Sequence, residues 1–302
     1  MAVLYQKYRP QRFAEVVGQD GIVRTLRNAA RNNQLAHAYL FTGSRGIGKT
    51  TLARLIAKAA NCQNLDDGDP CGTCNPCLAI TAGNFLDVVE IDAASHTGVD
   101  NVRELIEHVQ FKPSHGRMKV FIVDEVHMLS KAAFNALLKT LEEPPSHAMF
   151  ILATTDIEKV PDTIISRTQR FDYRKISNEH MLAALKKIAE AEQLQLPDGT
   201  LKLVIANAEG GMRDALSLLD TVASLGGTIT IEDVRMLLGL TSTAVVEELV
   251  GYIELHNAAK IPEFIEAQTV VGSDFVVFNR HVLEYLRQML VAKITSVVPV
   301  TT

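Results

Sequence analysis

Residues 38–51 read AYLFTGSRGIGKTT, a run that joins an apolar segment to a glycine-rich turn and then to a helical pattern. From Gly43 to Thr50 the spacing is Gly-x-x-x-x-Gly-Lys-Thr, which is typical of a phosphate-binding P-loop between a strand and a helix. Glycines let the backbone curl so that successive N–H groups point at phosphate oxygens, and the following helix adds its N-terminal partial positive charge. The sequence therefore predicts a phosphate site here, and a chance glycine turn is the less favoured alternative.

Each part of this loop has an expected contact. Lys49 is expected to reach the β- and γ-phosphates and to act in catalysis, and the Thr50 hydroxyl is expected to ligate Mg²⁺. The predicted nucleotide-binding residues of this segment are Gly43, Ser44, Arg45, Gly46, Ile47, Gly48, Lys49, Thr50 and Thr51.

An acidic pair, Asp124 and Glu125, follows the apolar run in KVFIVDEVH (119–127), at the carboxyl end of a predicted buried strand. Ligands bind just outside that end of the strands in open α/β sheets. We therefore expect Asp124 to bind Mg²⁺ and Glu125 to polarise a water for attack on the γ-phosphate. A solvated turn would explain an isolated Asp-Glu pair, but the P-loop in the same chain favours the catalytic interpretation.

Apolar runs alternate with amphipathic segments over residues 1–174. Strands are predicted at 38–42, 85–91, 119–124, 149–155 and 169–173, and helices at 19–33, 49–60, 99–110 and 130–142. This alternation predicts an α/β domain with a parallel sheet and helices on both faces. Residues 175–239 show only helical patterns, and Thr230 and Asp233 are expected to begin the last of these helices. Further helical pattern over 240–302 predicts the start of a third domain that is cut short.

The composition is that of a globular protein of two or three domains, with 302 residues, of which 47% are hydrophobic and 22% charged. The formal net charge of −5 argues against a general coat of nucleic-acid-binding lysines, although a local basic patch is compatible with it. Charges come early at the N-terminus without a following apolar core, and no run of about 18 apolar residues is present. We therefore expect a soluble cytoplasmic protein that does not bind membranes.

Four cysteines fall within CQNLDDGDPCGTCNPC (62–77), at Cys62, Cys71, Cys74 and Cys77. A Cys-x-x-Cys turn can place two thiolates on one metal ion, and the more distant cysteine can complete a tetrahedron. Polar neighbours argue against free buried thiols, and the spacing departs from the cysteine run of bacterial iron–sulfur sites. We therefore favour a structural zinc site, whose metal supplies the folding energy of a segment with almost no apolar residues. Stable disulfides are not expected in a reducing cytoplasm.

These motifs, in this order, resemble those of AAA+ ATPases and, more closely, of the gamma/tau subunits of the bacterial DNA polymerase III clamp loader. KYRPQRFAEVVGQ (7–19) resembles the N-terminal box of that family, and the two motifs described above resemble its Walker A and Walker B. The positions of sensor 1, the Ser-Arg-Cys motif and sensor 2 are matched by ATTD (153–156), SRTQRF (166–171) and GGMRDALSLLD (210–220). The family also has a zinc module where the cysteines fall here.

The resemblance implies a fold in three parts. The first is an α/β AAA+ P-loop NTPase domain with a parallel sheet (1–174) and a zinc-binding insert (62–77). The second is an all-helical lid domain (175–239), and the third is a partial helical collar domain (240–302), which mediates oligomerisation in this family.

The resemblance also implies roles for single residues. Thr155, at sensor 1, would orient the attacking water or touch the γ-phosphate. Arg167 would reach the site of a neighbouring subunit as an arginine finger in trans. Arg213, at sensor 2, would contact phosphate in cis and couple the nucleotide state to the angle between two domains. Thr168 replaces the usual cysteine, and we expect little consequence because the neighbouring guanidinium makes the contact.

The N-terminal box is expected to supply the adenine pocket. Val17 and Gly18 are the main candidates, with Tyr8 and Pro10 as further apolar contacts.

Taken together, the resemblance implies an ATPase that uses ATP, Mg²⁺ and structural Zn²⁺. It would act with other clamp-loader subunits and copies of itself to open a sliding clamp and place it on primer-template DNA. Two alternatives are a different AAA+ DNA-remodelling ATPase and a scaffold subunit without turnover. The cysteine insert and the Ser-Arg-Thr motif argue against the first, and the intact Gly-Lys-Thr and Asp-Glu motifs argue against the second.

Polymerase activity is not expected, because the chain lacks the carboxylate set of a polymerase palm. Contacts with DNA are less defined. Lys112, Arg117 and Lys119 can line a channel, but a solvated basic face is equally compatible with the pattern.

Overall fold

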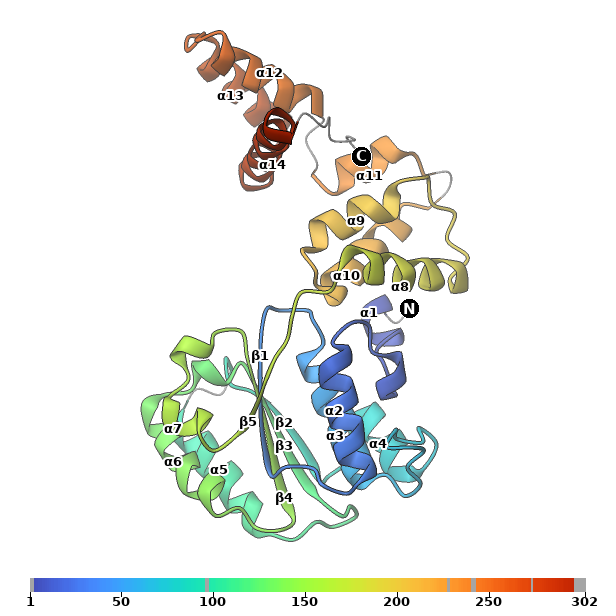
Figure 1. Cartoon of the computed structure of the whole chain (residues 1–302), viewed down its shortest axis with the longest axis vertical. Coiled ribbons are helices and arrows are strands. Elements are labelled where there is room, and N and C mark those ends of the chain that lie inside the picture. The colour runs from blue at the N-terminus through green and yellow to red at the C-terminus, as the bar shows by residue number, and fades with distance from the viewer. Residues whose placement is uncertain (1–2, 96–97, 227–228, 240–242, 273, 296–302) are drawn as a thin grey trace. The chain divides into compact units, whose positions relative to one another are not determined.

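A computed structural model describes residues 3–95, 98–226, 229–239, 243–272 and 274–295 (Figure 1). The chain forms two compact units. The first contains Met1–Leu185 and Ala208–Ser217, and the second contains Lys186–Asn207 and Leu218–Thr302.

The first unit is built on a five-stranded parallel sheet in the order β2-β3-β4-β1-β5. The strands are β1 (Ala38–Thr42), β2 (Val88–Asp92), β3 (Lys119–Asp124), β4 (Ala148–Thr154) and β5 (Gln169–Asp172). Their register pairs Thr42 with Thr154 and Asp92 with Asp124, so the carboxyl ends of the strands lie level along one edge. In a parallel sheet this edge is where ligands bind, and it receives the P-loop and the acidic pair.

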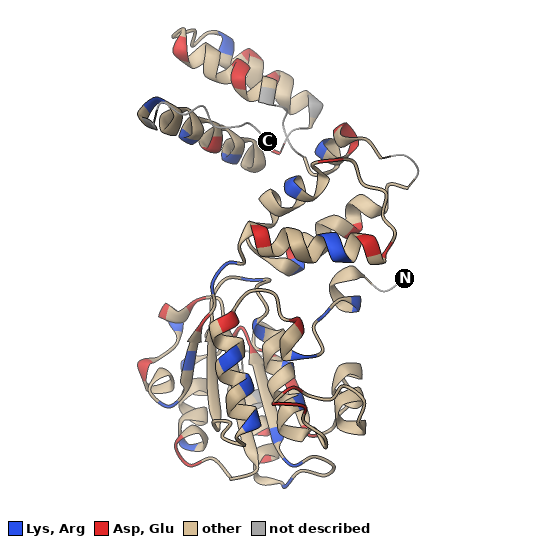
Figure 2. Cartoon of the chain, turned by 45° about the vertical axis from the view of Figure 1, so that its right-hand side comes forward, with Lys and Arg blue, Asp and Glu red and all other residues tan. Residues whose placement is uncertain are grey.

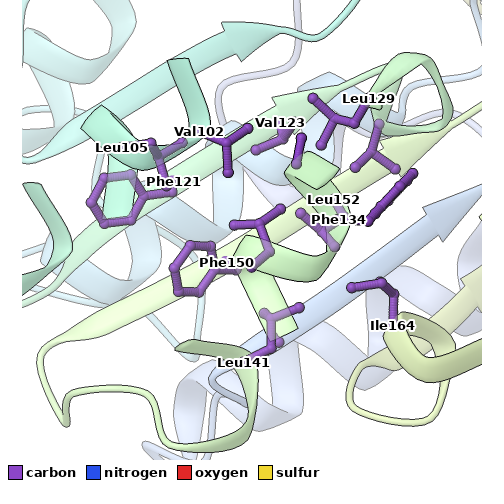
Figure 3. Packing of buried hydrophobic residues seen from close by; sticks show 14 of the residues in the cluster. Val102, Leu105, Phe121, Val123, Leu129, Phe134, Leu141, Phe150, Leu152 and Ile164 are labelled. Carbon is purple, nitrogen blue, oxygen red and sulfur yellow. The ribbon is translucent and has the colours of Figure 1, made fainter. Parts of the chain in front are cut away.

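Both faces of the sheet are buried, because successive side chains of the central strands alternate between two cores. On one face Phe121, Phe150 and Leu152 pack with residues of α5, α6 and α7 (Figure 3), and the Phe121 and Phe150 rings are stacked with centroids 5.3 Å apart. On the other face Tyr39 and Phe41 pack with residues of α2 and α3. This burial explains why the strands read as nearly continuous apolar runs.

The helices of the first unit connect the strands and cover the sheet. They include the short segments α1 (Leu4–Lys7) and α7 (Asp162–Ile165) and the 3-10 turns η1 (Phe13–Glu15), η2 (Val126–Met128) and η3 (Ile157–Lys159). The longer helices are α2 (Asp20–Arg31), α3 (Lys49–Asn61), α4 (Asn75–Ala82), α5 (Val99–Gln110) and α6 (Lys131–Glu142). Three helices contribute to both units, namely α8 (Asn178–Ala191), α9 (Thr200–Ala208), of which only Ala208 belongs to the first unit, and α10 (Met212–Ala223).

Helices alone make up the second unit in the described residues. The helices that lie in it entirely are α11 (Ile231–Leu237), α12 (Thr243–Glu254), α13 (Lys260–Val271) and α14 (Phe275–Thr295). As predicted, α11 begins with a capping box, in which Thr230 and Asp233 bond each other's backbone N–H groups. A small cluster of Val246, Val250, Phe264 and Phe278 joins α12, α13 and α14. Among the described residues no helix is long and apolar enough to cross a membrane.

Several element boundaries differ from the sequence prediction by a few residues, and two of these differences concern strands that lead to the site. The second strand begins at Val88 rather than at residue 85, because Asp87 turns inward and accepts the backbone N–H groups of Ser114, His115 and Gly116. The fourth strand ends at Thr154, so Thr155 lies just beyond it. Helix α4 was not predicted. The proposed third domain, 240–302, includes residues 240–242, 273 and 296–302, which lie outside the described residues.

Candidate functional site

The P-loop follows β1 directly and leads into α3. Gly43, Gly46 and Gly48 have φ values of 140°, 78° and 102°, which L side chains rarely adopt. The Gly43 N–H donates to the Thr154 carbonyl at 3.3 Å, which fixes the start of the loop to β4. Within the described residues, none of the backbone N–H groups from Ser44 to Gly48 donates to another group of the chain. Together with the N-terminus of α3, these groups form a site suited to phosphate oxygens.

Lys49 lies inside this loop and is only 6% exposed. Its Nζ donates to the carbonyls of Gly43 at 2.7 Å and Ser44 at 2.8 Å. Burial lowers the pKa of Lys49, and the nearby carboxylates of Glu125 and Asp124 oppose that shift. The ammonium therefore lies between the loop and the acidic pair, where a triphosphate would compete for it.

The predicted magnesium ligands are in direct contact. The Thr50 Oγ1 donates to Asp124 Oδ2 at 2.7 Å, although the two residues are far apart in sequence. The contact arises because Thr50 is in the first turn of α3 and Asp124 ends the strand β3. A hydroxyl and a carboxylate fit Mg²⁺, which takes one or two protein oxygens and keeps the rest of its octahedron for water and phosphate.

Glu125 is adjacent to this pair and is held by the end of β4. Its Oε2 accepts the Thr155 hydroxyl at 2.8 Å and the Thr155 backbone N–H at 3.2 Å. The ring of His127 also lies close, with Nδ1 3.4 Å from the same oxygen. The structure thus brings the predicted base and the predicted sensor residue together.

The proposed adenine segment contacts the chain that follows β5. Gly18 has a φ of 68°, and a Cβ added there would lie 3.6 Å from Ile176. The next residue, Gln19, makes two hydrogen bonds to the backbone of Arg174, at 2.6 Å through its Nε2 and at 3.2 Å through its Oε1. Val17 and Gly18 are half-buried. Tyr8 and Pro10, earlier in the N-terminal box, are half-buried as well.

The first turn of α10 lies against the P-loop. The Arg213 N–H donates to the Gly46 carbonyl at 3.2 Å, and the Arg213 guanidinium stacks 5.0 Å from the centroid of the Tyr5 ring. A Cβ at Gly46 would come within 2.8 Å of the Asp214 carboxylate, and one at Gly211 within 2.7 Å. Both glycines therefore permit the close approach that places Arg213 beside the loop.

Arg167 has a different setting. It follows α7, and its Nε donates to Glu142 Oε1 at 2.8 Å while its second guanidinium nitrogen also contacts that carboxylate. A third bond runs to the Thr163 carbonyl at 2.7 Å. Its side chain is 31% exposed, and these partners belong to the α6–α7 region rather than to the P-loop of the same chain.

The four cysteines form one cluster. Their Sγ atoms all lie within 4.8 Å of one another, and those of Cys74 and Cys62 are 4.0 Å apart. A Zn–S bond of about 2.3 Å in a tetrahedron separates sulfurs by about 3.8 Å, so the cluster is compatible with zinc. Cys74 is the N-cap of α4 and Cys77 lies in its first turn, which explains the spacing of these two residues.

The ionisation of these thiols is uneven. Backbone N–H groups of Thr73 and Cys74 lower the pKa of Cys71 to about 5, so it favours the thiolate. Burial raises the pKa of Cys62 and of Cys77. A divalent cation would offset the cost of deprotonating the two buried thiols, which is the usual coupling between metal binding and thiolate formation.

Polar contacts also hold the cysteine insert to the N-terminal box, contrary to the expectation that metal alone would order it. Asp69 is 2% exposed and accepts the Phe13 N–H at 2.5 Å, and Arg12 pairs with Asp66 at 2.8 Å. On α2, Arg27 pairs with Asp67 at 3.1 Å. These bonds close around a tight turn at Gly68, where an added Cβ would lie only 2.3 Å from the Arg27 carbonyl.

Two of the three basic residues considered for DNA binding have structural roles. Lys119 is 8% exposed and donates its Nζ to the His108 carbonyl at 2.9 Å. Arg117 bonds the Cys62 carbonyl. The suggestion of a basic channel is therefore wrong for Lys119, whereas Lys112 is exposed. Along the ribbon in Figure 2, basic and acidic residues both occur in each of the two units.

Sequence reasoning gave no role to His127 and Thr154, although both lie in quoted motifs. His127 Nδ1 is 3.0 Å from Thr154 Oγ1, and Thr154 is fully buried. The available signal was a polar side chain near the end of an apolar run: Thr154 directly follows AMFILA (148–153), and His127 follows VFIV (120–123) and the acidic pair. Tyr5, which stacks on Arg213, precedes the N-terminal box (7–19) and carried no comparable signal in the sequence.

Comparison with protein families gives two matches along the chain. Residues 18–177 match the model described as DNA polymerase III, delta subunit, which covers more than half of the chain. Residues 181–228 match the model described as DNA polymerase III clamp loader subunit, ATPase lid domain.

Curated relatives extend the similarity over nearly the whole chain. The chain is 47% identical to DNA polymerase III subunit tau of Bacillus subtilis strain 168, covering 96% of this chain and 52% of the relative. It is 41% identical to DNA polymerase III subunit tau of Escherichia coli K12, covering 97% of this chain and 46% of the relative. It is 39% identical to subunit gamma of Buchnera aphidicola subsp. Baizongia pistaciae, over 97% and 79%. The chain thus spans about half the length of the tau subunits it matches.

Among solved structures, the RuvB Holliday junction branch migration motor of Thermotoga maritima aligns with a TM-score of 0.57 at 17% identity. The alignment covers 88% of this chain and 86% of that protein. At this identity the likeness concerns the fold alone, and it supports the predicted AAA+ P-loop architecture.

Proposed function

The chain belongs to the family of DNA polymerase III gamma and tau subunits, and on that premise we propose that it binds and hydrolyses ATP as a subunit of a clamp loader. One observation carries the proposal for the chemistry. The Thr50–Asp124 contact and the Glu125–Thr155 contact lie at one end of the sheet, and they support the roles proposed for these residues as magnesium ligands, base and sensor. Residues that serve only to fold the domain would have no reason to converge there.

In the proposed reaction the P-loop N–H groups and Lys49 hold the β- and γ-phosphates. A water attacks the γ-phosphorus, its proton passes to Glu125, and the bond between the γ-phosphorus and the bridging oxygen breaks to give ADP and phosphate. Thr155 fixes the Glu125 carboxylate at one oxygen and leaves the other for the water. Val17 and Gly18 would hold the adenine.

Thr50 and Asp124 would hold Mg²⁺, which neutralises charge on the β- and γ-phosphates when bound. The residues Cys62, Cys71, Cys74 and Cys77 would hold Zn²⁺ in a structural role. Four thiolates complete a tetrahedron, so such a site has no open position for substrate.

Two arginines would link the site to its surroundings. Arg213 begins a helix that continues into the second unit, so a contact between its guanidinium and phosphate would make the orientation of that helix depend on nucleotide. Arg167 is joined to Glu142 and is remote in bonding from its own P-loop, which supports a role at the site of a neighbouring subunit. The proposed partners are other clamp-loader subunits, further copies of this chain, a sliding clamp and primer-template DNA. A subunit of the bacterial replication machinery would act in the cytoplasm.

The test uses the full-length subunit assembled with its partner subunits. ATP hydrolysis is measured with and without a sliding clamp and primed DNA. We expect stimulation by clamp and DNA together, and we expect Glu125→Gln to bind ATP but to lose turnover by about 100-fold or more.

An exposed carboxylate in the first turn of α8, Glu179, provides the matched control Glu179→Gln, which should retain full turnover. If the rate of ATP hydrolysis is the same with and without clamp and primed DNA, the proposed role in clamp loading is wrong. Turnover that survives Glu125→Gln would overturn the assignment of the base.

A further inference from the structure

The environment of Glu125 includes a buried histidine that the proposed reaction does not use. We propose that His127, itself held by the hydroxyl of Thr154, is a positioning residue for Glu125 and fixes the carboxylate that takes the proton from water. This inference rests on the proposed hydrolysis of ATP, and it assigns to the Walker B segment a third functional residue beside the acidic pair.

His127 sits in a closed network at the carboxyl edge of the sheet. Its side chain is only 10% exposed, and its Nδ1 lies 3.0 Å from Thr154 Oγ1 and 3.4 Å from Glu125 Oε2. Thr154 is fully buried at the end of β4. The ring therefore bridges the segment after β3 to the end of β4, the two strands whose ends form the proposed site.

The hydrogen bonds of Thr154 indicate where the proton on His127 lies. The Thr154 Oγ1 accepts the Asp156 N–H at 3.0 Å and donates to the Asp156 carbonyl at 3.0 Å, which uses its single proton. The contact with His127 then requires Nδ1 to be the donor. A proton on Nδ1 also removes the lone pair from the edge of the ring that lies 3.4 Å from Glu125 Oε2, so that edge does not repel the carboxylate.

In this arrangement one oxygen of Glu125 is saturated. Oε2 accepts the Thr155 N–H and the Thr155 hydroxyl, and Nδ1 of His127 lies 3.4 Å from it. Among the described residues no partner is recorded for Oε1. Donors grouped on one oxygen fix the rotation of the carboxylate and leave the other oxygen to accept a proton, as a general base requires.

The backbone at Glu125 supports the same conclusion. Its φ is 48°, a left-handed conformation that a residue with a long side chain seldom adopts, and its N–H donates to Asp124 Oδ1 at 3.0 Å. Such strain persists only where the surroundings over-determine it. The turn η2 begins directly after Glu125 and contains His127. Glu125 is therefore held by Asp124, which precedes it in the chain, and by His127, which follows it.

The test compares variants of the assembled full-length protein in steady-state ATP hydrolysis. We expect His127→Ala to lower kcat by roughly 10- to 100-fold, the usual loss for an orienting partner of an active-site group, and to leave the Kd for ATP within about twofold. His127→Asn keeps a donor near the position of Nδ1 and should recover most of kcat. His127→Gln places its amide near the position of Nε2 and should not.

The role of the Thr154 hydroxyl, which holds the His127 ring, is tested in the same assay. Thr154→Val removes the hydroxyl with little change in shape and should lower kcat, whereas Thr154→Ser should retain it. In the Glu125→Gln background, His127→Ala should cause no further loss, because a positioning residue acts only through the group it positions. His147 is the matched control, since it is a partly buried histidine that bonds the Val109 carbonyl at 3.0 Å, and His147→Ala should leave kcat unchanged.

The outcomes separate this inference from the proposed function. If Glu125→Gln abolishes turnover while His127→Ala and Thr154→Val do not change it, ATP hydrolysis stands and the role of His127 is refuted. If His127→Ala weakens ATP binding and lowers the melting temperature, and Asn does not restore kcat, His127 is only structural and the proposal fails. If Glu125→Gln itself has no effect, the proposed function fails first.

Discussion

Lys49 illustrates how much a single side chain depends on its enclosure. Its ammonium is almost entirely shielded from water, and its nearest partners are two carbonyls of its own loop. Burial lowers the pKa of Lys49, while Glu125 and Asp124 favour the charged form. The residue is therefore a cation whose interaction with phosphate is weakly screened, and its loss cannot be compensated by solvent.

We expect Lys49→Ala to abolish ATP binding, because it removes this charge from the phosphate site and leaves two loop carbonyls without their donor. The measurement is the Kd for ATP by calorimetry or a fluorescent analogue. Lys202→Ala, at an exposed position of α9, is the control and should bind ATP normally. An unchanged Kd in Lys49→Ala would refute the assignment of the P-loop.

The sequence predicted those residues whose role depends on spacing along the chain. Lys49, Thr50 and Asp124 could be placed because a glycine loop and a strand end fix their positions. His127 and Thr154 could not, because their contact depends on the register of two strands that are separated by a helix. Tyr5 was missed for a similar reason, since its stacking on Arg213 joins the two ends of the first unit.

Single elements also reveal contacts that hydrophobic patterns do not encode. The loop before β3 is held by side chains rather than by a ladder. Asp87 accepts three N–H groups, at 2.6 to 2.8 Å, and Asn61 accepts those of Arg117 and Met118 at 2.8 and 2.9 Å. This arrangement shortens β2 relative to the prediction and anchors the start of β3 to the end of α3.

Asp87 gives a stability prediction with a defined dependence on pH. Burial raises the pKa of Asp87, but the three N–H donors and His115 outweigh burial, so the pKa lies below its ordinary value. The stabilisation is therefore present above the unfolded pKa of about 4 and is lost as pH falls through the lower folded value. We expect Asp87→Asn to reduce the free energy of unfolding by about 1–3 kcal/mol at pH 7, and the difference from the parent to shrink below about pH 4.

Urea unfolding followed by circular dichroism at several pH values checks this result. Asp198→Asn, at an exposed position before α9, should show little change at any pH. A deficit for Asp87→Asn that stayed constant into the acid range would contradict the role of the carboxylate charge.

The cysteine insert leads to a prediction that joins metal to nucleotide. Asp69 and Asp66 hold Phe13 and Arg12, which lie in the N-terminal box proposed to bind adenine. We expect removal of metal with a chelator, or Cys71→Ser, to increase hydrogen exchange over residues 11–18 as well as over 62–82, and to weaken ATP binding several-fold.

Metal content by mass spectrometry accompanies this experiment, with one ion expected per chain. Leu78→Ser, which changes an exposed residue of α4, is the control and should keep both the metal and the exchange pattern. If hydrogen exchange rises only within 62–82, the predicted coupling between the cysteine insert and the N-terminal box is wrong.

Helices and strands were predicted well where burial fixes the pattern of apolar residues. They were predicted poorly where polar contacts determine where an element begins or ends. The central strands are apolar on both faces and were placed nearly to the residue. Helix α4 was missed because its start is set by Cys74 as N-cap and by Pro76 in the first turn, inside a segment that reads as a loop. The turn at Gly68 likewise depends on an approach to α2 that only the tertiary structure reveals.

For the molecule as a whole, the proposed assembly places part of the catalytic apparatus outside the chain that binds ATP. Arg167 is paired with Glu142 and is partly exposed. An arginine supplied to a neighbouring site would have to exchange this carboxylate for phosphate, which offers stronger charge–charge attraction in a drier environment.

We expect Arg167→Ala to bind ATP with normal affinity but to lose clamp- and DNA-stimulated hydrolysis by about 1,000-fold or more in the assembly. Mixing Arg167→Ala subunits with Glu125→Gln subunits should restore part of the turnover, because some interfaces then combine an intact base with an intact arginine. Arg280→Ala, on α14 of the second unit, serves as a control for loss of a surface charge. Full stimulated turnover by Arg167→Ala assemblies would exclude a role in trans.

At this level the sequence predicted architecture better than assembly. Strand and helix alternation predicted the α/β unit, and the ordered series of motifs indicated the AAA+ class. The packing of α12, α13 and α14 around Val246, Val250, Phe264 and Phe278 had no distinctive pattern, because short amphipathic helices can pair in many ways. The partners of the exposed apolar residues on α14 are equally undetermined by periodicity.

Because the strand ends are level, the two edges of the sheet should respond differently to insertions. The edge at the carboxyl ends of the strands should not tolerate them, whereas the edge at the amino ends should. Adding one residue within β3 or β4 would turn Asp124 or Thr154 to the opposite face and dismantle the catalytic geometry. The turns that enter β1 and β4, at 32–37 and 143–147, lie at the edge of the amino ends and carry no residue of the proposed chemistry. A fluorophore or affinity tag grafted there would report on this protein while leaving its reaction intact.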